Sequence, residues 1–261
     1  MQKISKIFLY DEPSVPEIEI EQLAIFLRDI LHIKIEIRKN FFKHFIQDKT
    51  VSYKLAASRI YNIHTPFEKH KPTEEEIQIE EFNIENKPSD NIILYDGFEI
   101  QNVLLDCIPD EELRSDIFHL IITTKLGCTY DYDDYRYHGR AVICSNPAII
   151  STTGIIEAPA KPREYYLYMQ QKFALGLNLD ALKEQFRGRF LEYHDKRLGI
   201  IIRGYALQAI FYYITLDPFC HSKECILHNA HWQEDLIYTQ TKSGKLCDQH
   251  KKILELIKNH E

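Results

Sequence analysis

The chain has little glycine and proline and no excess of positive charge. Nine glycines and ten prolines in 261 residues exclude a collagen-like or low-complexity chain, and an aromatic content of 12% excludes a disordered one. The formal net charge is -7. This balance argues against broad electrostatic capture of nucleic acid or of an anionic membrane, so no nucleic-acid partner is expected.

Long hydrophobic runs and common catalytic motifs are also missing. No apolar run approaches the roughly 20 residues that span a bilayer, and the run at residues 7–10 is too short for a signal peptide. We therefore expect no membrane partner and a cytoplasmic location. The sequence contains neither a glycine-rich phosphate loop nor a Gly-x-Ser-x-Gly nucleophile elbow.

The first part of the chain alternates between strand and helix patterns. Residues 6–10 and 32–38 have strand patterns, and residues 18–31 between them have the apolar spacing of a helix. A β-α-β opening favours parallel strands. Further segments resemble buried strands: residues 91–95, 118–123, 140–145 and 148–151. The polar, acidic stretch at 64–86 is interpreted as a solvated loop or insertion.

The second half of the chain has helix patterns. They cover residues 163–176, 180–194 and 200–214, and the last is apolar enough to be buried centrally. We therefore expect an α/β fold in which a mixed β-sheet has flanking helices. A single domain over residues 1–261 accounts for this order.

The most specific motif is a cluster of cysteines near the C-terminus. Cys220 and Cys225 form one close pair, and Cys247 and His250 form a second after a longer loop. Zinc prefers four tetrahedral sulfur or nitrogen ligands, and Cys3His is a known composition of structural sites. In a reducing compartment such cysteines indicate metal binding rather than disulfides. The sequence thus predicts one structural Zn2+, bound by a C-terminal zinc knuckle at residues 220–250.

Two histidines between these pairs suggest a second, weaker candidate. His228 and His231 would share a face with Glu234 or Asp235 if the segment were helical. A second metal site there is one interpretation, and local packing or hydrogen bonding is the other, which we favour.

The segment from Cys220 to His250 resembles the archaemetzincins. In that family a helix with the pattern HExxHxxGxxH is followed at once by Cys-x4-Cys-x-Met and later by Cys-x2-Cys. Here Leu227 stands at the methionine position and His250 replaces the last cysteine. The resemblance implies a zincin-like fold whose four-ligand knuckle holds a structural zinc. It also implies a helix before the knuckle in which three histidines bind a catalytic zinc and the glutamate is the general base.

The helix before the knuckle departs from that pattern. We count back from Cys220 without gaps. The first histidine of the pattern then falls on Ala209 and the glutamate on Ile210. The second histidine falls on Tyr213, the glycine on Leu216 and the third histidine on Phe219. Residues 195–219 contain no histidine, glutamate or cysteine. Such a helix cannot supply two imidazoles and a carboxylate base to zinc.

Three functions follow from these observations. The favoured one is a non-catalytic relative of zinc peptidases that binds a peptide or protein partner. The second is a zinc metallopeptidase or hydrolase with a rebuilt site that uses His228, His231, His119 or His138. The third is a structural subunit of a complex, for which the tyrosine-rich stretch at residues 130–137 would offer an aromatic surface.

Overall fold

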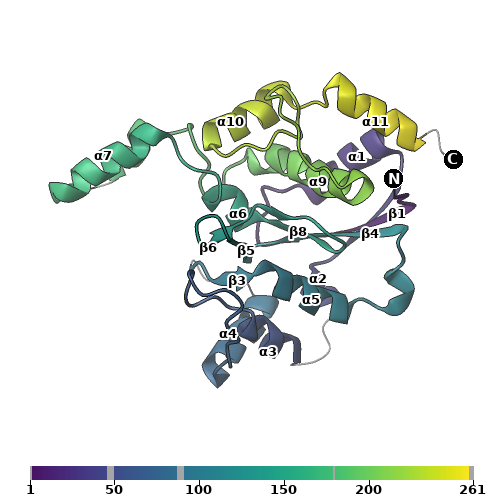
Figure 1. Ribbon diagram of the computed structural model, residues 1–261, viewed down its shortest axis with the longest axis horizontal. Helices are drawn as coiled ribbons and strands as arrows, with labels where there is room; N and C mark the ends of the chain where they lie inside the picture. The colour runs from purple at the N-terminus through teal and green to yellow at the C-terminus, as the bar shows by residue number, and fades with distance from the viewer. Residues whose placement is uncertain (1, 46–49, 87–90, 179, 259–261) are drawn as a thin grey trace.

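The computed structural model describes residues 2–45, 50–86, 91–178 and 180–258. Its main sheet lies in the middle of the molecule (Figure 1). The sheet has five strands in the order β2 (Lys34–Arg38), β1 (Lys6–Tyr10), β4 (Ile117–Thr123), β8 (Ala148–Ser151) and β7 (Val142–Ile143). Only β7, at one edge, runs antiparallel to its neighbour. The expected mixed sheet with flanking helices is thus confirmed.

Both faces of this sheet are covered. Within β1, Ile7 and Leu9 belong to one hydrophobic cluster, while Phe8 and Tyr10 belong to another on the opposite face. This is the period-two alternation of a strand buried on both sides. The first cluster is covered by two helices, α1 (Ile20–Leu31) and α9 (Leu198–Thr215). The second faces the helices α2 (Phe41–Phe45), α3 (Thr50–Ala57), α4 (Glu74–Glu85) and α5 (Gly97–Cys107).

A smaller sheet lies beside the main one. Its order is β3 (Leu94–Asp96), β5 (Leu126–Asp131) and β6 (Arg136–Gly139), and β5 and β6 form an antiparallel hairpin. Other elements are η1 (Asp110–Glu112), α6 (Thr152–Glu157), α10 (Gln233–Ile237), η2 (Tyr238–Ser243) and α11 (Asp248–Lys258). The tyrosine-rich stretch at residues 130–137 lies on the β5–β6 hairpin.

The acidic stretch at residues 64–86 differs from the sequence interpretation. Its second half is helix α4, which begins with a capping box between Thr73 and Glu76. Glu80 of this helix is fully buried, with Arg59 Nη2 at 2.6 Å and Lys125 Nζ at 2.5 Å. The helix is therefore anchored to the core by ion pairs, a contact that a count of acidic residues does not reveal.

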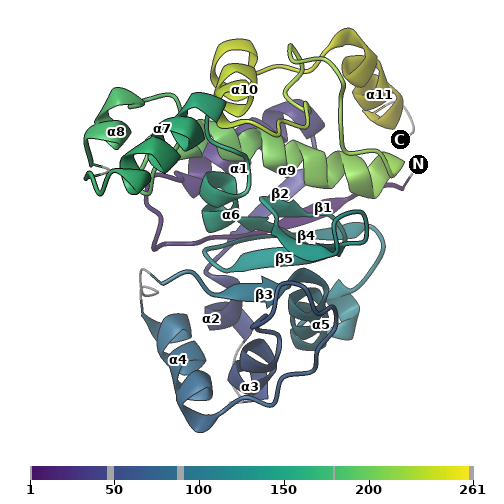
Figure 2. The same cartoon turned by 60° about the vertical axis from the view of Figure 1, so that its left-hand side comes forward.

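Two helices extend away from the body at one side (Figure 2). They are α7 (Arg163–Ala174) and α8 (Asp180–Gln185), and α8 is shorter than the helix expected over residues 180–194. A small cluster of Tyr165, Leu182, Phe186 and Phe190 holds them together. We call residues 163–190 the arm.

Helix α9 is the longest helix of the described chain and lies across the main sheet (Figure 2). It is long and apolar enough to cross a membrane. However, 67% of the helix is buried inside the protein, and Ile201, Ala209 and Ile210 have no exposed surface. These contacts are those of a core helix, as the sequence predicted.

Candidate metal centre

The four predicted zinc ligands come from three short segments around the end of α9. Cys220 follows the turn that ends α9, and Cys225 closes a tight turn in which its amide donates to the carbonyl of Ser222. Cys247 directly precedes α11, and His250 lies in the first turn of that helix. The amide of Cys220 donates to the carbonyl of Leu227, and this bond brings the two ends of the first pair's loop together.

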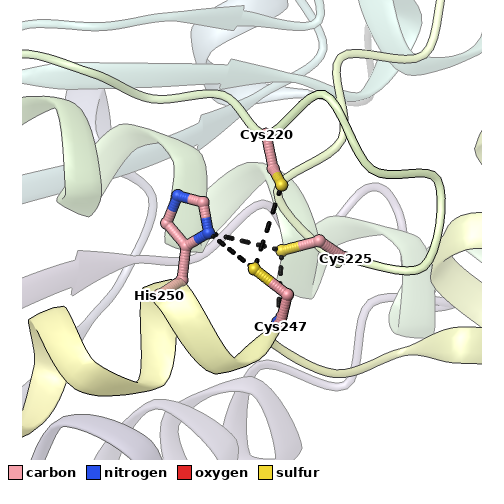
Figure 3. A group of neighbouring side chains, drawn as sticks. All are labelled: Cys220, Cys225, Cys247 and His250. Carbon is pink, nitrogen blue, oxygen red and sulfur yellow. Dashed lines mark hydrogen bonds between the residues drawn. The ribbon is translucent and has the colours of Figure 1, made fainter.

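The side chains of these residues converge on one point (Figure 3). Their four ligand atoms all lie within 4.8 Å of one another. Cys220 Sγ is 4.0 Å from Cys247 Sγ, and His250 Nδ1 is 3.8 Å from Cys225 Sγ and 3.0 Å from Cys247 Sγ. A tetrahedral zinc with Zn–S bonds of about 2.3 Å needs ligand atoms about 3.8 Å apart. The donor set and its spacing therefore fit Zn2+.

Backbone amides support the sulfur atoms of this cluster. The amide of Ser222 donates to Cys220 Sγ at 3.4 Å, and the amide of Cys247 donates to Cys225 Sγ at 3.5 Å. Such bonds stabilise the thiolate, which is the form that binds metal. Burial raises the pKa of the Cys225 thiol to about 12. At Cys247 burial also opposes the thiolate, but hydrogen bonds with His250, Cys225 and Cys220 together outweigh it and lower the pKa to about 6.

The cluster is joined to the hydrophobic core rather than exposed on a loop. Cys225 and His250 are buried, and the ring of His250 packs against Phe211 of α9 with a centroid distance of 5.6 Å. The side-chain amide of Gln208, also on α9, donates to the carbonyl of His228. A metal bound here would hold α11 and the 220–228 loop against α9.

The two histidines between the pairs do not join the cluster. His228 Nδ1 lies 3.1 Å from the carbonyl oxygen of Cys220, and His231 is exposed. Both precede α10 rather than lying on a helix. Within the described chain, neither belongs to a group of three or more residues that could hold a metal.

The other histidines considered for a rebuilt site lie in different sheets. His119 on β4 is buried, with its ring nitrogens next to the Tyr10 hydroxyl and the Glu112 carbonyl. His138 on β6 pairs with Asp134 at 2.8 Å, and Asp131 joins them to form a second group with metal-ligand chemistry. This group is at an exposed hairpin tip, where acidic residues are common without a metal. The stretch also departs from the EF-hand pattern of calcium loops, because Tyr135 and Arg136 occupy positions that need an acidic ligand and a glycine.

The family model described as "Probable metallopeptidase family (DUF6775)" matches residues 3–257. The chain belongs to this family. The match confirms the predicted relationship to metallopeptidases over nearly the whole chain. No curated protein and no solved structure matches the chain.

Proposed function

We propose that this member of the metallopeptidase family binds one Zn2+ through Cys220, Cys225, Cys247 and His250, and that the ion is structural. The convergence of the four ligand atoms carries this proposal. Because all four positions are filled by protein atoms, the site would leave no open position for water or substrate, which a catalytic zinc requires. The site would instead contribute to folding of the C-terminal part.

The end of α9 supports a more specific relationship to the archaemetzincins and their zincin-like fold. Leu216 ends this helix with φ of 63°, a left-handed conformation that favours glycine. The ungapped count from Cys220 places the pattern's glycine at this residue. A leucine that keeps the glycine conformation agrees with descent from a chain that carried the full pattern.

We further propose that the chain is non-catalytic. At the positions of the first histidine and the glutamate, Ala209 and Ile210 are fully buried in the core. At the position of the second histidine, the hydroxyl of Tyr213 donates a hydrogen bond to the carbonyl of Ser115. The histidines of the rebuilt-site alternative are dispersed over two sheets and a loop, so no observation favours that alternative.

The remaining role is binding of a peptide or protein partner, as a pseudoenzyme or as part of a complex, in the cytoplasm. Reducing conditions there would keep the three cysteines available as zinc ligands.

Zinc content per chain tests the metal proposal. Elemental analysis of protein purified in metal-free buffer should give one zinc per chain, and Cys247→Ser should lose it. Cys144→Ser is the matched control, because this partly buried cysteine lies outside the cluster and should leave the zinc content unchanged. Two zinc ions per chain would contradict the non-catalytic proposal, and no zinc would contradict the structural site.

Peptidase activity tests the second part. The zinc-loaded chain should not cleave a denatured protein or a mixed peptide library. Cleavage that is abolished by a chelator and also by His138→Ala or His228→Ala would show a rebuilt active site and overturn the proposal.

A further inference from the structure

The arm presents apolar side chains to solvent at its far end. Phe173 is 81% exposed, Leu175 72% and Leu177 55%, and Leu167 on the outer face of α7 is 59% exposed. The arm's own small core, formed by residues on its inner face, leaves these side chains uncovered. Scattered exposed leucines are ordinary, but three strongly exposed apolar side chains within five residues of a projecting element indicate a contact surface.

Helix α4 presents a matching stripe. Ile79 and Phe82, one helical turn apart, are 42% and 58% exposed, and Glu75 lies on the same face. Ile92, close to this stripe in the chain, is 48% exposed. Ile92 and Asn83 also line a cavity of about 140 Å³, whose other walls include Lys125 and Tyr193.

The two surfaces have opposite charge. The arm contains five basic and three acidic residues, a net charge of +2 in a chain whose total is -7. Helix α4 contains six glutamates and no basic residue, and Glu74 and Glu75 are exposed. Complementary charge around apolar centres is how protein interfaces select their partner.

The arm and α4 also face the same side of the molecule, one above and one below the sheet (Figure 2). A two-fold axis on this side would let each chain's arm reach the α4 of the other. Such an isologous contact occurs twice in one dimer. The total interface area is therefore twice the area that one arm buries against one α4 helix.

We propose that two copies of this chain form a two-fold dimer in which the arm tip of each copy packs on the α4 stripe of the other. Phe173 and Leu175 supply the apolar anchors on the arm, and Phe82 supplies the anchor on α4. Lys172, next to Phe173 at the arm tip, faces the exposed Glu74 and Glu75 of α4. This proposal is independent of the metal and of any catalytic activity.

Sedimentation velocity on the full zinc-loaded chain is the first test. The unaltered protein should be a dimer at about 100 µM. The arm variant Phe173→Glu and the α4 variant Phe82→Glu should each raise the dissociation constant, on the order of 30-fold or more, as loss of an interface anchor does. Leu256→Glu is the control, because this α11 residue is similarly exposed at 51% and should leave the dimer intact. Unchanged far-UV circular dichroism shows that each variant is folded.

Mixing the two variants gives a sharper test. In a dimer of one arm variant and one α4 variant, the intact arm of one chain meets the intact α4 of the other. The mixture should therefore recover part of the dimer that each variant alone has lost. A monomeric unaltered protein, a dimer unaffected by Phe82→Glu, or failure of the mixture to recover would overturn the proposal. So would binding of the monomer to lipid vesicles through Phe173, which would assign the tip to a membrane.

Discussion

Gly204 of α9 lies directly against the side chain of Gln240. A Cβ atom at Gly204 would come within 2.2 Å of Gln240 Oε1, and the Gln240 amide is fixed because it donates to the carbonyl of Ile226 at 2.9 Å. This contact joins α9 to the segment between the two halves of the cysteine cluster. It also explains why a glycine is present inside an otherwise apolar helix, where it costs about 1 kcal/mol relative to alanine.

Replacing that glycine should therefore destabilise the protein. Gly204→Ala should lower the free energy of unfolding by about 1–2 kcal/mol, because crowding of a buried amide outweighs the gain in helix propensity. Urea unfolding measures the difference. In the double variant Gly204→Ala/Gln240→Ala the alanine at 204 should no longer be harmful, and a loss equal to that in the single variant would contradict the contact as its cause.

At position 216 a glycine should instead stabilise the protein. The side chain of Leu216 is 77% exposed and the residue's φ is 63°, so Leu216→Gly relieves backbone strain while removing little buried surface. We expect a stabilisation of about 1 kcal/mol, measured as a higher midpoint of urea unfolding. Leu256→Gly, in the regular helix α11, should instead destabilise by about 1 kcal/mol. The same sign in both variants would show that backbone conformation is not the determinant.

The buried ion cluster around Glu80 should make stability depend on pH. Burial alone would raise the pKa of Glu80, but Lys125, Arg59 and the Tyr95 hydroxyl outweigh it and hold the pKa below 4.5. A lowered pKa in the folded state contributes stability above pH 4.5, and this contribution is lost as the pH falls through the folded-state pKa. The free energy of unfolding should therefore decrease in acid.

Glu80→Gln isolates that contribution. At pH 7 it should cost about 3–5 kcal/mol, because it leaves the buried Arg59 and the partly buried Lys125 without their carboxylate. The difference from the unaltered protein should shrink below pH 4.5, since protonated Glu80 resembles glutamine. Glu184→Gln is the control, because its ion pair with Arg187 is exposed and should be worth about 0–1 kcal/mol. A constant difference across the pH range would rule out the ionised Glu80 as the origin.

Removal of zinc should loosen one part of the molecule selectively. Chelation should increase amide hydrogen exchange in α11 and in residues 220–228, because these segments are joined mainly through the predicted ligands. Exchange in β1 and β4, at the centre of the sheet, should stay slow. Cys225→Ser should reproduce the pattern without a chelator, and a uniform increase over the whole chain would argue against a local structural role.

Much of the fold could be read from local patterns. The strand at Lys6–Tyr10, the helix at Ile20–Leu31 and the strand at Lys34–Arg38 follow directly from apolar spacing. Helix α5 was missed, and α4 was interpreted as a loop. The α4 prediction failed because its acidic composition hides a buried ion pair, and the partners Arg59 and Lys125 are far away in the sequence.

The cysteine cluster could also be predicted from the sequence, because two close pairs of ligand residues are a local pattern. By itself the sequence determined the β-α-β opening, the buried helix α9, the relationship to metallopeptidases and the four candidate zinc ligands, because each depends on residue type and short spacing. Only the tertiary structure decided that the ligand atoms converge, that His228 and His231 stay outside them, and that the arm and α4 are left uncovered. These outcomes depend on how segments far apart in the chain pack together, and no local pattern encodes that.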